Sequence, residues 1–260
     1  MRLDKNPLKS ALQKEKQTYG CWVTLAHPLI PEILAPAGFD WLAIDMEHSS
    51  IDLSTLLPLI ISTEARGMVP LVRVGENDPN LIKRIMDAGA YGVIVANVCS
   101  AEEAEAAVAA VKYPPSGRRG VGLYRAQGYG RQFEAYKKWL IEESVVIIQI
   151  EHIKAVNDID AIFSVKGIDA FVIGPYDLSG SMGKPGALTD PGVEEAVNRV
   201  LKAAKKYGIT PGFHSVPPDS KVALRRQKQG FKFLGFSVDA VLLGEAATQG
   251  LAQIKKDKTV

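Results

Sequence analysis

Short apolar runs rich in β-branched residues alternate along this chain with longer segments whose apolar positions recur every three or four residues. The short runs predict strands and the longer segments predict helices that bury one face. We expect strands at residues 19–26, 40–45, 69–74, 91–96, 145–150, 168–173, 210–214 and 231–238. We expect helices at residues 3–16, 28–37, 53–66, 77–88, 101–112, 132–143, 191–207, 219–229 and 240–255, with a helix-like segment between the fifth and sixth strands and an irregular stretch at 113–130.

Regular alternation of strands and helices over 260 residues is typical of a (β/α)8 TIM barrel. The main alternative is an open doubly wound sheet, which would call for a glycine-rich turn after an early strand, and the first predicted strand has none. We therefore predict one barrel domain spanning residues 1–260. In such a barrel the chemistry lies at the C-terminal ends of the strands.

Composition limits the classes of binding partner and the cellular compartment that we expect. The net charge of +2 is spread evenly, so the chain shows no nucleic-acid footprint and no membrane-binding patch. No apolar run reaches the roughly 20 residues that span a bilayer, and the first residues lack the apolar core of a signal peptide. Cys21 and Cys99 suggest no disulfide framework. We expect a cytoplasmic protein.

Two carboxylates follow neighbouring predicted strands. Glu151 comes directly after 145–150, and Asp177 lies just past a Gly174-Pro175 turn after 168–173. The ends of adjacent parallel strands lie side by side, and like charges held that close repel unless a proton or a cation lies between them. We therefore predict a divalent metal site. In the alternative interpretation Glu151 caps the following helix and Asp177 caps a turn.

Other polar residues fall at the same predicted end of the barrel. The second strand ends in Asp45, with His48 three residues later, and Arg73 lies near the end of the third strand. Gln149 shares a strand face with Glu151, and His214 ends the seventh strand. Asp45 could instead cap a turn and His48 could be a surface histidine. Arg73, inside an apolar strand, must find a partner.

The sequence argues against Schiff-base and zinc chemistry, and several charged residues outside the strand ends have simple interpretations as surface charges. No lysine lies at a C-terminal strand end for a Schiff base, and no cysteine or histidine cluster suits zinc. Two carboxylates with room for water suit Mg²⁺ or Mn²⁺. From the residues alone, Asp87 is a surface residue at a helix end, and Arg118, Arg119 and Arg125 are solvated loop charges.

Five segments in a fixed order carry a resemblance to a known family. They are AIDMEHSS, LVRVGENDPNLIKRIMDAGAYGVIVANV, YPPSGRRGVG, IIQIEH and GPYDLSGSMG, and the likeness runs from about Tyr19 to Leu243. They resemble the metal-dependent class II pyruvate aldolases of the HpcH/HpaI family. The resemblance implies a (β/α)8 barrel, a bound Mg²⁺, Mn²⁺ or Co²⁺, and a 2-oxo acid and an aldehyde as small-molecule partners. It also implies a homo-oligomer, usually a hexamer, with the C-terminal helix exchanged between subunits.

The resemblance assigns roles to five residues that the strand ends also point to. It implies that Glu151 and Asp177 hold the metal. His48 would be the catalytic base, working with Asp45 through a water, and Arg73 would stabilise an enolate. The implied reaction is cleavage or formation of a 4-hydroxy-2-oxo acid from pyruvate and an aldehyde.

Further roles rest on the resemblance alone. Asp87 matches an aspartate that raises the basicity of the histidine. Gln149, with the backbone around Tyr176 and Asp177, would contact pyruvate. Tyr176 stands where relatives usually have alanine or serine, and His214 where several have an apolar residue. The acceptor aldehyde therefore stays open.

Other functions fit the same scaffold. A Claisen-type enzyme, such as a citrate-forming enzyme or a CoA-ester lyase, or a decarboxylating enzyme resembling macrophomate synthase would share the metal and the enolate. The chain has no extra basic loop suited to the phosphoadenosine group of CoA. A non-catalytic barrel is the remaining alternative, against which the full set of strand-end residues argues.

Overall fold

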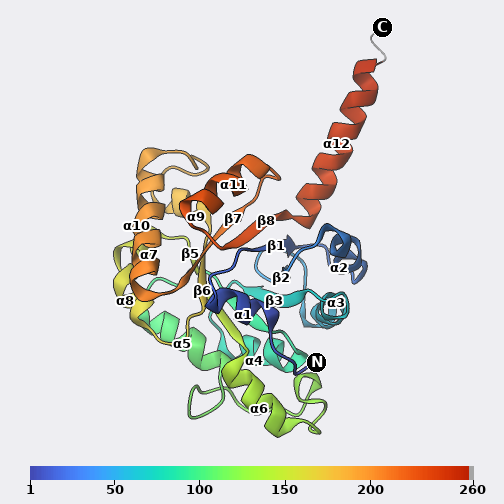
Figure 1. Ribbon diagram of the computed structural model, residues 1–260, viewed down its shortest axis with the longest axis vertical. Coiled ribbons are helices and arrows are strands. Elements are labelled where there is room, and N and C mark those ends of the chain that lie inside the picture. The colour runs from blue at the N-terminus through green and yellow to red at the C-terminus, as the bar shows by residue number, and fades with distance from the viewer. Residues whose placement is uncertain (258–260) are drawn as a thin grey trace.

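The computed structural model describes residues 1–257 and forms a closed barrel of eight parallel strands in sequence order (Figure 1). The predicted (β/α)8 fold is confirmed. The strands are β1 (Thr18–Val23), β2 (Trp41–Asp45), β3 (Val69–Val74), β4 (Gly92–Val95), β5 (Val145–Ile150), β6 (Ala170–Ile173), β7 (Thr210–Ser215) and β8 (Phe233–Val238). Closure by the β1–β8 pair leaves no unpaired sheet edge.

Most helices lie between successive strands and surround the barrel, while the first helix precedes β1 and the last follows β8. The helices are α1 (Pro7–Gln13), α2 (Leu29–Leu34), α3 (Leu53–Ala65), α4 (Pro79–Ala88), α5 (Ala101–Val111), α6 (Phe133–Glu142), α7 (Ile153–Asn157), α8 (Ile159–Ser164), α9 (Pro175–Ser181), α10 (Pro191–Tyr207), α11 (Ser220–Gln229) and α12 (Asp239–Asp257), with short 3₁₀ turns η1 (Ala35–Ala37) and η2 (Arg125–Gln127). The segment between β5 and β6 forms two helices, α7 and α8. Helix α9 was not predicted, because the Gly174-Pro175 pair suggested only a turn.

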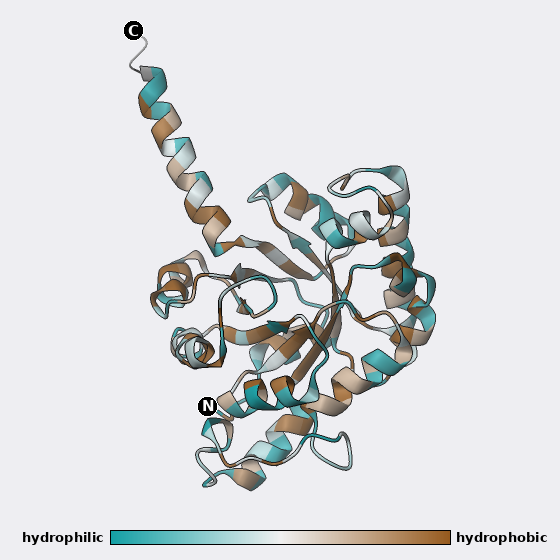
Figure 2. Cartoon of the chain, turned by 180° about the vertical axis from the view of Figure 1, so that it is seen from behind, coloured by the Kyte–Doolittle hydropathy of each residue, from teal (hydrophilic) through white to brown (hydrophobic). Residues whose placement is uncertain are grey.

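Aromatic side chains fill the barrel interior. The Trp41 and Phe233 rings stack with centroids 4.0 Å apart. Two glycines make room for the tryptophans: a Cβ at Gly20 would lie 2.1 Å from the Trp41 ring, and one at Gly235 would lie 2.3 Å from the Trp22 ring. The interior of the barrel is thus a packed core. The brown strands of Figure 2 show this apolar centre.

Capping residues fix where the helices begin and end. Asp52, Asp78 and Asp190 each accept hydrogen bonds from backbone N–H groups in the first turn of α3, α4 and α10. Gly89 and Gly208 end α4 and α10 in the left-handed conformation that favours glycine. Because the helices start at the C-terminal strand ends, these caps help to set the loops that carry the candidate site.

Helix α12 extends away from the barrel (Figures 1 and 2). Its first residue, Asp239, is buried and accepts hydrogen bonds from the backbone N–H groups of Thr24, at 2.9 Å, and Leu25, at 3.0 Å. Beyond that anchor, Leu243 and Ile254 are 66% and 58% exposed. None of the helices in residues 1–257 is both long and apolar enough to cross a membrane.

Candidate functional site

An arginine pinned between two carboxylates lies at the ends of β2 and β3. Arg73 is buried in register with Asp45. Its Nε donates to Asp45 Oδ1 at 2.9 Å and its Nη2 to Oδ2 at 2.5 Å, while Nη1 lies 3.0 Å from Oε2 of Glu47. Burial opposes the guanidinium charge, but the contacts with Asp45 outweigh burial and raise the pKa of Arg73. The expectation that Arg73 must have a partner is confirmed.

Asp45 also organises the loop that follows it. Its Oδ1 accepts hydrogen bonds from the backbone N–H groups of Glu47, at 3.0 Å, and His48, at 3.2 Å. Asp45 is therefore a turn cap as well as the arginine's partner. The His48 side chain is 64% exposed, and its Nε2 lies 4.0 Å from Glu47 Oε2. In residues 1–257 the ring nitrogens of His48 have no direct hydrogen bond with Asp45, so the predicted dyad would need the intervening water.

Glu151 is a buried carboxylate at the end of β5. Its Oε1 accepts a hydrogen bond from the backbone N–H of Asn97 at 2.8 Å, and its Oε2 accepts one from Nε2 of Gln149. His152, not Glu151, caps α7 through its Nδ1, so the capping alternative for Glu151 is wrong. The pKa of Glu151 is raised to about 7, chiefly by burial; the charges of Glu47 and Asp177 also raise it, and the hydrogen bonds from Gln149 and Asn97 oppose the rise.

Asp177 lies in the first turn of α9 and is exposed at the rim of the same site. The N-cap of this helix is Gly174, and no side-chain hydrogen bond caps it, so Asp177 does not act as a cap. A Cβ at Gly174 would lie 2.5 Å from Glu151 Oε2. At the end of β3, a Cβ at Gly75 would lie 2.9 Å from the Cγ of Glu47. Glycine at these two strand ends leaves the space that the carboxylates occupy.

These side chains share one cavity of about 570 Å³ at the C-terminal end of the barrel. It is lined by Glu47, His48, Asn97, Glu151, His152, Tyr176, Asp177, Gly180, Ser181, Pro185 and Gly186. Tyr176 is 43% exposed at the rim. The structure thus brings together the two predicted metal ligands, the histidine and the tyrosine, with the Arg73–Asp45 pair beside them.

The donor set fits a hard divalent cation. Four carboxylates, those of Asp45, Glu47, Glu151 and Asp177, accompany the single guanidinium of Arg73. In residues 1–257 no three His, Cys, Asp or Glu side chains converge closely enough to hold an ion by themselves. Two carboxylates would leave the remaining coordination positions to water and substrate, as Mg²⁺ and Mn²⁺ sites commonly do.

Two buried oxygen atoms beside Glu151 and Arg73 lack hydrogen-bond donors. They are Oε1 of Gln149 and Oε2 of Glu47, whose contact with Arg73 is a charge contact without hydrogen-bond geometry. A buried acceptor without a donor is costly. Donors brought by a bound ligand or its water would satisfy both atoms, so the observation supports a ligand at this point.

His214 is part of the barrel wall. It is buried, its ring stacks on Trp22 with centroids 3.9 Å apart, and its Nε2 lies 3.3 Å from the carbonyl oxygen of Ser237. Burial lowers the pKa of His214 to about 4, so the ring is neutral at physiological pH and its Nε2–H donates to that carbonyl. This fixed ring shapes the interior beneath the mouth.

Asp87 lies at the opposite end of the barrel from His48 in the same chain, because α4 runs from the mouth toward the N-terminal strand ends. It forms an ion pair with Arg119 at 2.6 Å. The Arg119 side chain is fully buried and donates a hydrogen bond to the Tyr136 hydroxyl. Action of Asp87 on the histidine therefore needs a second copy of the chain and stays a prediction.

The interpretation of the loop arginines as solvated charges is wrong for two of them. Arg119 is buried against Asp87, and Arg125 pairs with Glu64. Each of these arginines lies on the irregular stretch that follows α5, far along the chain from its carboxylate. Sequence spacing could not reveal these long-range pairs.

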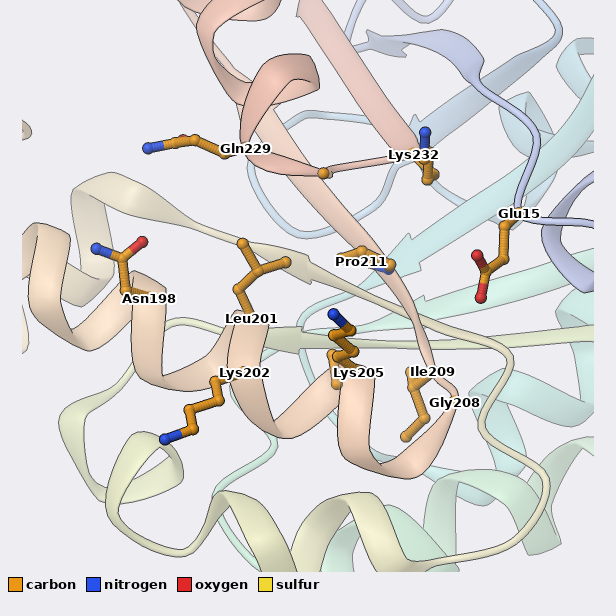
Figure 3. Close-up of a pocket in the computed structure, with 12 residues that line it drawn as sticks. Glu15, Asn198, Leu201, Lys202, Lys205, Gly208, Ile209, Pro211, Gln229 and Lys232 are labelled. Carbon is orange, nitrogen blue, oxygen red and sulfur yellow. The ribbon is translucent and has the colours of Figure 1, made fainter.

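A second cavity of about 570 Å³ lies at the other end of the barrel, beside α10 and the start of β7 (Figure 3). Its lining carries three lysines, among them Lys205 and Lys232, and one carboxylate, Glu15. It has no histidine, and no pair of carboxylates converges there. The described residues that suit a metal or acid–base site therefore line the cavity at the C-terminal end of the barrel and not this one.

Glu47 lines the cavity but is not among the residues predicted from the sequence, and the same is true of Asn97 and His152. A glutamate in a loop is common, so its residue type alone does not mark it as part of a site. The available signal was spacing: strand side chains alternate, so Asp45 and Glu47 face the same side if the chain stays extended past the end of β2.

Comparison with known proteins identifies the family of this chain. A model of the HpcH/HpaI aldolase/citrate lyase family matches residues 18–243. The 5-keto-4-deoxy-D-glucarate aldolase of Escherichia coli is 34% identical over 252 residues, covering 96% of this chain and 97% of the relative. The structure of an HpcH/HpaI aldolase/citrate lyase family protein from Burkholderia cenocepacia has a TM-score of 0.91 at 32% identity, covering 96% of this chain and 100% of that one. Citrate synthase SbnG has a TM-score of 0.88 at 29% identity, covering 100% of both chains.

Fold and site together define a (β/α)8-barrel lyase of the aldolase type. This chain belongs to the HpcH/HpaI aldolase/citrate lyase family.

Proposed function

We propose that this protein is a divalent-metal-dependent aldolase that cleaves a 4-hydroxy-2-oxo acid to pyruvate and an aldehyde, and forms it in reverse. The observation that carries the proposal is Glu151, a buried carboxylate with a pKa raised to about 7, held beside Asp177 and Glu47 and close to the Arg73–Asp45 pair. Such a cluster is unfavourable unless a cation compensates it.

Glu151 and Asp177 are the residues that would hold the ion, and Mg²⁺ or Mn²⁺, or Co²⁺ in their place, suits their oxygen donors. When bound, the ion would supply Lewis-acid stabilisation of the negative charge that develops on the 2-oxo group. The Nε2 of Gln149 donates a hydrogen bond to Oε2 of Glu151. The Oε1 of Gln149 itself is left free to accept a hydrogen bond.

Arg73 adds a fixed positive charge to the site. Its bidentate contact with Asp45 sets the plane of the guanidinium, so donors not used by Asp45 can reach an enolate oxygen without reorganising. His48 lines the same cavity and is accessible to substrate. It would take the proton from the 4-hydroxyl group during cleavage and return it during synthesis, with Asp45 acting on it through a water.

For the substrate, we propose a 2-oxo acid derived from a sugar acid. The support is the 34% identity to a protein named 5-keto-4-deoxy-D-glucarate aldolase. Tyr176 and His152 line the cavity, and Tyr176 is exposed at its rim. We assign the contact with the aldehyde portion to this rim, and contact with pyruvate to Gln149 and to the backbone around Tyr176 and Asp177.

We also propose that the protein is a homo-oligomer, a hexamer by family resemblance, with α12 exchanged between subunits. The support is the projection of α12 away from its own barrel with Leu243 and Ile254 exposed. A second copy could also bring its Asp87 to His48. Both cysteines are free, which agrees with a reducing compartment, and we propose the cytoplasm.

The test is exchange of the pyruvate methyl protons in D₂O, followed by NMR with EDTA-treated protein before and after addition of Mn²⁺ or Mg²⁺. Exchange that requires the metal is the expected result, and it does not depend on the aldehyde. Absence of exchange with metal would refute pyruvate enolisation. Oxaloacetate with and without acetyl-CoA would then test the citrate-forming alternative, which the similarity to citrate synthase SbnG favours over other Claisen reactions.

A further inference from the structure

Glu47 is the acidic side chain of the cavity to which neither the sequence analysis nor the family comparison gives a role. It lies two residues past β2, and its Oε2 atom is buried without a hydrogen-bond partner. The same atom is 3.0 Å from Nη1 of Arg73. Glu47 lines the cavity that Glu151 and Asp177 also line.

The surroundings hold Glu47 in this position. Its backbone N–H donates to Asp45 Oδ1 at 3.0 Å, and the absence of a side chain at Gly75 leaves room for its Cβ and Cγ. A Cβ on residue 75 would approach the Cγ of Glu47 to 2.9 Å. The carboxylate is therefore directed into the mouth by the strand end on one side and by a glycine on the other.

No three acidic, histidine or cysteine side chains in residues 1–257 converge on one point, so the structure does not place Glu47 as a third ligand beside Glu151 and Asp177. It is near enough for its charge to bear on both Glu151 and Asp177. Its Oε2 is a buried, unpartnered acceptor in the cavity that Glu151 and Asp177 also line, so it is placed to hold a water bound to the ion. Side chains that orient bound groups around a metal commonly change its affinity 10- to 100-fold.

We propose that Glu47 is a positioning residue of the metal site, whose buried Oε2 accepts a hydrogen bond from water on the ion and thereby strengthens metal binding. The inference rests on the proposed function. It assigns Glu47 no proton transfer and no direct contact with substrate.

The test is the Kd for Mn²⁺, measured by electron paramagnetic resonance of free Mn²⁺ without any substrate. Glu47→Gln removes the charge while keeping the shape, and we expect it to raise the Kd about 10- to 100-fold. The matched control is Glu76→Gln, since Glu76 is exposed in the loop after β3 and does not line the cavity. We expect that control to change the Kd less than about 2-fold, because exposed charges are screened.

Two further variants separate position from charge. Glu47→Asp keeps the charge but withdraws it by one methylene, and Gly75→Ala keeps Glu47 but displaces it. Weakened Mn²⁺ binding in both, with unchanged thermal unfolding of the metal-free protein, supports a positioning role. Wild-type affinity in Glu47→Gln, or in Glu47→Asp and Gly75→Ala together, overturns it. Wild-type protein that binds no Mn²⁺ would instead refute the proposed function itself.

Discussion

A methyl group added at Gly174 should disable the metal site without removing any polar group. Gly174 has φ −93°, which any residue can adopt, so the substitution carries no backbone penalty. Its Cβ would lie 2.5 Å from Glu151 Oε2 and 3.0 Å from Gln149 Nε2, whereas ordinary contacts begin at 3.4 Å. The Glu151 carboxylate must therefore retreat by roughly 1 Å, a displacement that can cost about 100-fold in catalysis.

We expect Gly174→Ala to raise the Kd for Mn²⁺ at least about 10-fold and to lower pyruvate methyl exchange about 100-fold. Crowding should also lower the free energy of unfolding by about 1–3 kcal/mol. Calorimetric Mn²⁺ titration, the NMR exchange assay and urea unfolding measure these three quantities.

The matched control is Gly180→Ala, on the same helix α9 and at the same cavity. A Cβ there meets nothing within 4 Å, and alanine favours a helix over glycine. We expect wild-type Mn²⁺ affinity and equal or greater stability. If Gly174→Ala binds Mn²⁺ as tightly as wild type, then the position of Glu151 does not determine metal binding and the site is assigned wrongly.

Arg73→Lys should lower kcat by about 10²- to 10³-fold, because an ammonium cannot match the bidentate contact with Asp45; steady-state kinetics that match wild type would contradict this. His48→Ala should lower kcat for aldol cleavage by about 10²- to 10⁴-fold, and wild-type turnover would remove His48 from the mechanism. In the metal-free protein the pKa of Glu151 is about 7 in the folded state and near 4.5 in the unfolded state. Because the folded state binds this proton more tightly, the free energy of unfolding should fall as the pH rises between these values. Glu151→Gln should remove this pH-dependent component from urea-unfolding curves. Pyruvate should bind, by calorimetry, only after Mn²⁺ is added, since the mouth is acidic; equal binding without metal would argue against a cation-mediated site.

The sequence predicts the barrel because its strands are local apolar runs whose ends are marked by glycine, proline and capping residues. It also predicts which side chains reach the mouth, since parallel strands deliver Asp45, Arg73 and Glu151 to the same end. These inferences need only the alternation of side chains along a strand and the barrel topology, both of which the sequence pattern indicates. The short helix α9 escaped prediction because Pro175 and Gly180 weaken any helical pattern, although Pro is well accepted in a first turn.

What the sequence could not supply were partners distant along the chain. Arg119 and Arg125 lie in a glycine-rich loop, where arginine is usually solvated. Their carboxylates, on Asp87 and Glu64, are 32 and 61 residues away. The role of Glu47 could not be predicted for a different reason. It depends on one buried oxygen atom without a hydrogen-bond donor, which sequence spacing alone cannot reveal.

The charge balance of the mouth connects the fold to the proposed reaction. Asp45 and Arg73 neutralise each other, which leaves Glu47, Glu151 and Asp177 facing a cavity where a 2-oxo acid would add a further negative charge. An anion cannot be held there by Arg73 alone, because two carboxylates already engage that guanidinium. A divalent ion would both relieve the repulsion among the carboxylates and attract the substrate carboxylate. The acidic excess that disfavours the metal-free site is therefore the feature that would make metal and pyruvate bind in that order.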